Sequence, residues 1–148
     1  MRVVNLHEDT WAGTGDYIGR PCILGNPYPM DGRLPRAEVV ERYRTEWLWP
    51  IVTDGRAGRW AGKPSVLAAY YRPGPGGPKA TRQRVPVAKG WPYGLGEEPR
   101  QAVWEAVSEL MARLRAGERV TLLCYCKPLP CHGDVLGNCL RWLLSEAS

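Results

Sequence analysis

The chain has 148 residues, of which 44% are hydrophobic and 24% charged, and a formal net charge of +5 at pH 7. This balance excludes a disordered or fibrous chain, and the length predicts a single domain, 1–148, with a buried core. The apolar runs are far shorter than a membrane span, and the first residues lack the apolar stretch of a secretory signal. We therefore expect a cytoplasmic protein without a membrane partner.

Apolar periodicity divides the chain into strands and helices. The expected elements are strands at 2–6 and 17–20, a turn at 25–27, a helix from Pro35 to Trp49 that ends at Pro50, a Gly/Pro-rich segment at 55–96, a helix at 97–116, a strand at 120–126 and a helix at 132–145. The last two helices each carry an apolar stripe of period 3.6, and the strand between them is an apolar run typical of a buried strand. This order predicts an α/β fold with a mostly parallel sheet, helices on both faces and a core built from residues 1–50 and 97–148.

The segment 55–96 differs in composition from the remainder of the chain. Fifteen of its 42 residues are Gly or Pro, and it has eight Lys or Arg and no acid, so it carries +8 and the remainder −3. Five aromatic residues are interleaved with these charges: Trp60, Tyr70, Tyr71, Trp91 and Tyr93.

Positive charge in this basic segment would attract nucleic-acid phosphates or an acidic protein surface, and exposed rings can stack on bases. The candidate polyanion- or partner-binding residues are Arg72, Lys79, Arg82, Arg84 and Lys89. Alternatively, the segment is a surface insertion whose aromatic rings pack back onto the core.

Three of the five cysteines and one of the two histidines lie within nine residues, 124–132. Cys131 and His132 fall at the start of the last expected helix, where unpaired N–H groups and the helix dipole favour negative charge. This position predicts a lowered pKa for the Cys131 thiol, with His132 as its base or partner. Gly133 lets a ligand approach closely, and Asp134 suits the first helical turn.

Spacing alone leaves four uses of these cysteines open. The first is an anion or nucleotide site, in which the helix N-terminus holds a phosphate and Cys131 or His132 lines the pocket. A zinc ion held by Cys124, Cys126, Cys131 and His132 is disfavoured, because paired C-x2-C knuckles are missing and adjacent residues rarely serve one tetrahedral centre. A redox pair of Cys126 and Cys131 lacks the C-x-x-C spacing. Finally, the thiols could simply fill an apolar strand–helix junction, and Cys139, on the apolar face of the last helix, is expected to be a small core residue. We assign no metal ligand and no cofactor.

Several short motifs together resemble a known family. They are Tyr17-Ile-Gly-Arg20, Gly25-Asn-Pro27, the helix at 36–44 with Tyr43-Arg44, and Cys124-x-Cys126-x-Pro128-x-x-Cys131-His-Gly-Asp134-Val-Leu136. Over residues 1–50 and 118–146 the chain resembles the domain-of-unknown-function family 4326, which occurs in bacteriophages and bacteria. The resemblance implies a compact Rossmann-like α/β domain and a phage or mobile-element setting, and it supplies no reaction.

The resemblance also implies that a set of polar residues gathers at one site. These are Asn5, Tyr17, Gly19, Arg20, Asn26, Cys124, Cys126, Cys131, His132 and Asp134. Such a mixture of cation, amide, thiol, imidazole and carboxylate is typical of a small-ligand pocket.

Two functions follow as hypotheses. In the first, the chain binds a nucleotide or another phosphorylated ligand, with or without catalysis. Arg20 and the last helix's N-terminus hold the anion, and Asn26 orients the ligand. Cys131 and His132 carry any chemistry, with Asp134 beside them. The remaining ligand-binding candidates are Asn5, Tyr17, Gly19, Cys124, Cys126 and Gly133.

In the second hypothesis, the chain is a non-enzymatic phage regulator that takes part in host takeover. Its basic aromatic segment would bind a host macromolecule in the host cytoplasm, either nucleic acid or an acidic surface of a machine such as RNA polymerase.

Overall fold

The computed structural model describes residues 1–5, 15–20, 22–29, 32–73, 91–124 and 131–146. The elements are β1 (Arg2–Asn5), β2 (Asp16–Tyr17), α1 (Arg36–Arg42), the π-helix η1 (Tyr43–Leu48), α2 (Trp49–Arg56), the 3-10 helix η2 (Leu67–Ala69), α4 (Glu97–Arg115), β3 (Thr121–Cys124) and α5 (His132–Glu146). The expected mixed α/β class is confirmed.

The strands form a parallel sheet in the order β1-β3-β2, with β3 in the middle. Asn5 pairs with Cys124 in register, and Tyr17 pairs with Leu123. The carboxyl ends of all three strands therefore meet at one edge of the sheet. The apolar run that predicted a buried strand is this central strand, as expected for a sheet with little exposed surface. The finer expectation, a Rossmann-like sheet with helices on both faces, stays a prediction.

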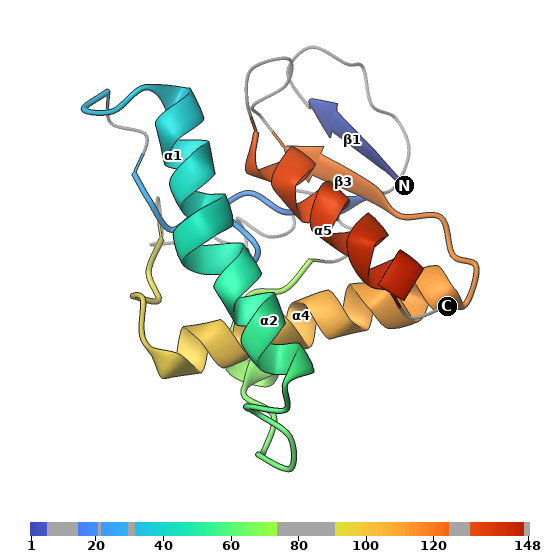
Figure 1. Cartoon of the computed structure of the whole chain (residues 1–148). Coiled ribbons are helices and arrows are strands. Elements are labelled where there is room, and N and C mark those ends of the chain that lie inside the picture. Colours follow the sequence, from blue (N-terminus) through green and yellow to red (C-terminus); the bar gives the residue numbers. More distant parts are fainter. Residues whose placement is uncertain (6–14, 21, 30–31, 74–90, 125–130, 147–148) are drawn as a thin grey trace.

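Helix α5 lies directly on the sheet, across β1 and β3 (Figure 1). Its buried face is apolar and includes Val135, Leu136, Cys139, Leu140 and Leu143. The close approach of α5 to the sheet depends on Gly133, because a Cβ there would lie 3.0 Å from Ile18 Cδ1 and 3.1 Å from Val3 Cγ1. Burial of each large apolar side chain contributes roughly 1.5–3 kcal/mol. Cys139 is a core residue, as predicted, and burial raises the pKa of its thiol to about 12.

Residues 36–56 form one continuous helical rod through α1, η1 and α2 (Figure 1). The prediction that the helix ends at Pro50 is wrong, because α2 continues to Arg56. Proline lacks an N–H group, and in a regular α-helix its ring clashes with the carbonyl four residues earlier. Here the turn before it is a π-helix, in which the N–H of Trp49 donates to the carbonyl of Arg44 five residues back. The wider turn of the π-helix gives the proline ring the room that an α-helix lacks.

Helix α4 crosses the rod near α2 and packs against it and α5 (Figure 1). Its buried stripe contains Val103, Val107, Leu110 and Met111, as the periodicity predicted. Gly117 follows the helix with a φ of 84°, the left-handed conformation that favours glycine after a helix end. An ion pair joins this helix to the sheet. Arg113 binds both carboxylate oxygens of the buried Asp16 in β2, at 2.8 and 2.9 Å.

The described part of the basic segment is integrated into the core. Trp60 and Leu67 are buried, and the N–H of Ile23 donates to the carbonyl of Tyr71. Glu105 on α4 holds the start of η2, because its carboxylate accepts the backbone N–H groups of Val66 and Leu67. No helix among the described residues is long and apolar enough to cross a membrane.

Candidate functional site

Two of the predicted site cysteines meet where β3 ends and α5 begins. The Sγ atoms of Cys124 and Cys131 lie 3.2 Å apart, well beyond the ~2.0 Å of a disulfide bond. Both side chains are buried. The backbone N–H of Gly133, in the first turn of α5, donates to the Cys131 sulfur at 3.2 Å. Cys131 therefore caps the helix N-terminus with its sulfur, where N–H groups and the dipole stabilise negative charge.

The His132 imidazole is buried, and the chain fixes its tautomer. Its Nε2 lies 2.8 Å from the carbonyl oxygen of Ile18. A carbonyl can only accept, so Nε2 carries the proton and Nδ1 of the neutral ring has the lone pair. That Nδ1 lies 4.0 Å from Cys131 Sγ. The arrangement gives the sulfur an adjacent proton acceptor.

The surroundings of His132 favour its neutral form. Burial lowers the pKa of His132, and the positive charge of Arg20 acts in the same direction. The hydrogen bond to Ile18 and the charges of Cys124 and Asp134 oppose the shift, and burial is the largest effect. Arg20, Cys124 and Asp134 are therefore close enough to influence this imidazole. The family resemblance implied that these three residues would lie at one site, and that role stays a prediction.

Tyr43 also contacts His132, although it is not among the predicted site residues. Its ring meets the imidazole edge-on, with centroids 5.3 Å apart. The hydroxyl donates to the carbonyl of Leu24 at 3.1 Å, and burial raises the pKa of Tyr43 well above its usual value. Tyr43 lies on the buried side of the helical rod, so its spacing is typical of a core residue, and only the motif resemblance pointed to it.

Arg20 is half-buried and held by main-chain carbonyls. Its Nε donates to the carbonyl of Asn26 at 2.6 Å, and its Nη2 donates to the carbonyl of Tyr28. Burial lowers the pKa of the guanidinium. No carboxylate pairs with it among the residues that the structure describes, so its charge is oriented but has no counter-ion there.

Asn26 has a structural role in the same loop. Its Oδ1 accepts the N–H of Tyr28 at 2.9 Å, and its Nδ2 lies 3.4 Å from the carbonyl of Val39. The first contact is an Asx-turn, which the Gly-Asn-Pro sequence favours. Asn26 thus ties the loop at 22–29 to α1 and sets the carbonyl groups that hold Arg20.

Tyr17 and Gly19 shape the backbone beside Arg20. The Tyr17 hydroxyl donates to the carbonyl of Arg20 at 2.8 Å, and a Cβ on Gly19 would lie 2.3 Å from that hydroxyl oxygen. Only glycine therefore allows the Tyr17 ring to cover this turn. Asp134 lies in the first turn of α5, and its N–H donates to the carbonyl of Cys131.

Some predicted residues lie outside what the structure describes or away from this site. Cys126 and the side chain of Asn5 belong to the first group, together with Lys79, Arg82, Arg84 and Lys89. Arg72 is exposed, and its Nη1 lies 3.6 Å from Oε2 of Glu109 on α4. The described residues contain no group of three or more His, Cys, Asp or Glu side chains placed to hold a metal ion.

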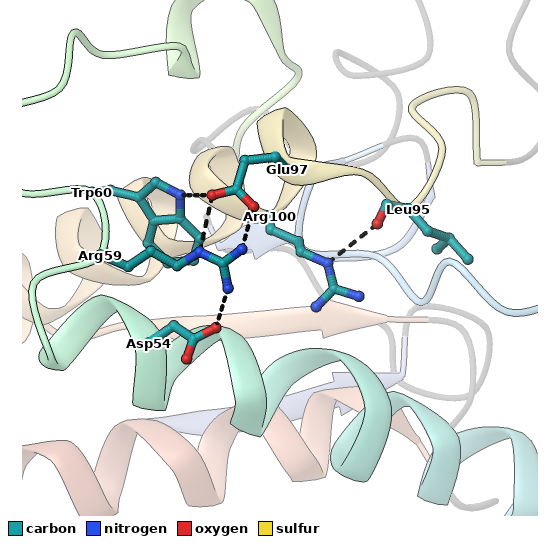
Figure 2. A network of polar contacts seen from close by, with 6 residues as sticks. All are labelled: Asp54, Arg59, Trp60, Leu95, Glu97 and Arg100. Atoms are coloured by element: carbon teal, nitrogen blue, oxygen red, sulfur yellow. Dashed lines mark hydrogen bonds and ion pairs between the residues drawn. The ribbon is translucent and has the colours of Figure 1, made fainter.

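Acidic side chains on α2 and α4 partly neutralise the positive charges in the described part of the basic segment. Figure 2 shows Arg59 between Asp54 and Glu97, with the Trp60 indole also donating to Glu97 at 2.8 Å. In the same view Arg100 donates to the carbonyl of Leu95 at 3.2 Å. The acids missing from the segment are supplied by α2 and α4.

The aromatic residues of the basic segment contact one another and the core. Trp91 meets Trp47 edge-on at 5.9 Å and Tyr93 at 4.9 Å, and Tyr70 lies 5.0 Å from Tyr93. Trp47 is fully buried. These rings have the packing arrangement that the surface-insertion alternative predicted.

The fold and this site define a mixed α/β protein with a buried Cys-His cluster beside an oriented arginine. Residues 4–142 match the family described as Domain of unknown function (DUF4326), and the chain belongs to it. The match runs across the basic segment as well as the two regions that carry the motif resemblance. Searches of curated proteins and of solved structures found no match.

Proposed function

We propose that this chain is a Rossmann-like protein that binds a nucleotide or another phosphorylated ligand beside the carboxyl ends of β2 and β3. The observation that supports this most is Arg20. A half-buried guanidinium held by two carbonyls, with no carboxylate partner among the described residues, favours an anion as its counter-ion. In parallel α/β sheets, ligands bind off the carboxyl ends of the strands.

The N-terminal end of α5 supports the same ligand class. The dipole of α5 favours a phosphate at this end, and Arg20 is close enough for its charge to act on His132 there. A phosphate there would be shared by Arg20 and the first turn of α5. Gly133 and Asp134 belong to that turn, and Asn26 positions the loop that carries Arg20.

Any catalysis at this site would begin at Cys131. A neutral His132 with its lone pair on Nδ1 can accept the thiol proton, and the Gly133 N–H stabilises the resulting negative sulfur. This is nucleophile activation by an adjacent base, with the Ile18 carbonyl orienting the base. The same two groups would also suit a purely binding site, because both can contact a ligand without reacting.

A thermal-shift screen tests the proposal. Nucleoside mono-, di- and triphosphates and sugar phosphates are added to the purified protein, and binding to the folded state raises Tm. At about 100 times Kd the expected stabilisation is about 2.7 kcal/mol. At least one compound should raise the Tm of the wild type, and the same compound should raise the Tm of Arg20→Gln by less. A panel without effect, or equal shifts in both proteins, would overturn the proposal.

The alternative, a phage regulator that binds nucleic acid or RNA polymerase in the host cytoplasm, rests on the basic segment. Arg59 and Arg72 in its described part pair with carboxylates. The candidates that remain from the predicted set are Lys79, Arg82, Arg84 and Lys89. Deletion of 74–90 should then abolish capture of such a partner, and unchanged capture would reject the alternative.

A further inference from the structure

A concave site lies between α2, α4 and α5, and none of its lining residues belongs to the Cys-His cluster. It is an open cleft of about 240 Å³. Its lining residues are Arg56, Trp104, Ser108, Met111, Arg115 and Leu143. This volume is many times the roughly 10–15 Å³ that a single water molecule needs. That is room for one ring and an attached polar group.

The floor of the cleft is apolar and its aromatic wall is held in place. Met111 and Leu143 are buried, and the ring of Trp104 lies against the backbone of α2. A Cβ on Gly55 would come within 2.1 Å of that ring, so glycine is required for the contact. The wall is thus fixed before any ligand arrives, which lowers the entropic cost of binding.

A second aromatic surface borders the cleft. Trp142 on α5 is exposed, and its ring meets Trp49 edge-on at 5.1 Å. The guanidinium of Arg56 lies 4.7 Å from the centre of the Trp142 ring. This cation–π contact positions Arg56 at the rim without neutralising its charge.

The rim carries two positive charges. Arg56 ends α2 and Arg115 ends α4, and both side chains are exposed. Neither guanidinium pairs with a carboxylate in the described part of the chain, whereas Arg113, two residues from Arg115, pairs with Asp16 and Glu118. The cleft therefore combines an apolar floor, a flat aromatic wall and two available cations.

We propose that this cleft binds a small aromatic anion, a flat ring that carries a phosphate or carboxylate group. The ring lies on Met111 and Leu143 against Trp104, and the anionic group lies between Arg56 and Arg115. Each part of the cleft contributes, because a ring without an anionic group would leave both cations unpaired, and an anion without a ring would make no contact with Trp104.

The test is an NMR titration of the ¹⁵N-labelled protein. Phenyl phosphate and benzoate are the two ring-bearing anions, and inorganic phosphate and phenol supply the anion and the ring separately. At least one ring-bearing anion should saturably shift the backbone amides of Ser108, Met111 and Leu143. Inorganic phosphate and phenol should bind at least tenfold more weakly. The stronger ring-bearing anion identifies the preferred group.

Variants separate this site from general anion binding. Arg56→Gln with Arg115→Gln should weaken the ring-bearing anion at least tenfold, and both positions are exposed, so folding is retained. The matched control is Arg141→Gln, an exposed arginine on α5 that bonds to Asn138 and should leave binding unchanged. Absent shifts, equal binding of inorganic phosphate, or unchanged binding in the double variant would overturn the proposal. None of these results concerns Arg20 or Cys131.

Discussion

The imidazole of His132 is bonded through Nε2 to the carbonyl oxygen of Ile18, 114 residues earlier, at 2.8 Å. This contact joins the first turn of α5 to the residue that follows β2. The contact turns Nδ1 of the ring toward Cys131. The imidazole is buried in the folded protein, and burial favours its neutral form.

Burial of His132 predicts a specific pH dependence of stability. The folded-state pKa lies below the usual value of 6.5, so the unfolded chain binds a proton more readily than the folded one. Stability should therefore be fully present above about pH 6.5 and decrease as the pH falls through that value. Urea unfolding of the wild type and His132→Gln at pH 7.5 and 5.5 measures the effect.

Glutamine can still donate to the Ile18 carbonyl but does not titrate, so His132→Gln should lose less stability than the wild type between these two pH values. The control is His7→Gln, which replaces the other histidine of the chain. An equal pH dependence in wild type and His132→Gln would contradict the assignment of a neutral buried imidazole.

Removing one charge of the ion pair between Asp16 and Arg113 should cause a large loss of folding stability. Asp16 is buried, and both its oxygens bind the guanidinium of Arg113, whose side chain is 29% exposed. Asp16→Asn should destabilise the protein by about 2–3 kcal/mol, below the 3–5 kcal/mol of a fully buried pair because Arg113 reaches solvent. The midpoint of urea unfolding measures the change.

Glu118 provides the matched control, since it binds the same guanidinium but is 51% exposed. Glu118→Gln should shift the midpoint far less than Asp16→Asn, because exposed pairs contribute little. Equal shifts in the two variants would mean that burial of Asp16 does not increase the stability lost when its charge is removed.

Glu105 predicts a local effect in the basic segment. Its carboxylate accepts N–H groups from Val66 and Leu67 and the hydroxyl of Ser65. Glu105→Gln leaves one oxygen acceptor and introduces an amide that cannot accept, so we expect a loss of about 1–2 kcal/mol. Hydrogen exchange at Val66 and Leu67 should accelerate.

The control for Glu105 is Glu109→Gln one turn later, where an Oε2 atom lies 3.6 Å from the exposed Arg72 guanidinium. That variant should leave exchange at Val66 and Leu67 unchanged. Slow exchange retained in Glu105→Gln would show that the start of η2 is held by other contacts.

Local sequence patterns correctly predicted those elements whose formation depends on neighbouring residues in the sequence. The stripe through Val103 and Val107 predicted α4, and Gly117 marked its end. Cys131 and His132 were expected at the start of the last helix and are found there. These features depend on period and on turn chemistry, which a single sequence contains.

Contacts between distant segments could not be read from the sequence. Asp16 and Arg113 are 97 residues apart, and each is unremarkable in its own surroundings. Pro50 is a helix breaker by residue type, and only the π-helix before it explains why the rod continues. Arg20 was predicted as an anion binder, but its hold on the carbonyls of Asn26 and Tyr28 depends on backbone geometry.

The central claim is that the Arg20 charge serves a phosphorylated ligand, and native mass spectrometry tests it most directly. Arg20→Lys and Arg20→Gln both lose the planar fork that binds the two carbonyls, but only lysine keeps the charge. Comparing them separates ligand binding from the structural role of the arginine. Arg119→Gln, at an exposed position, is the control for overall charge.

Purified protein is mixed with the phosphorylated compounds of the thermal-shift panel, and bound mass is recorded for all four proteins. We predict a one-to-one phosphorylated adduct on the wild type and Arg119→Gln, a reduced one on Arg20→Lys, and at least a tenfold loss on Arg20→Gln. No adduct on the wild type, or equal adducts on Arg20→Gln and Arg20→Lys, would contradict the account.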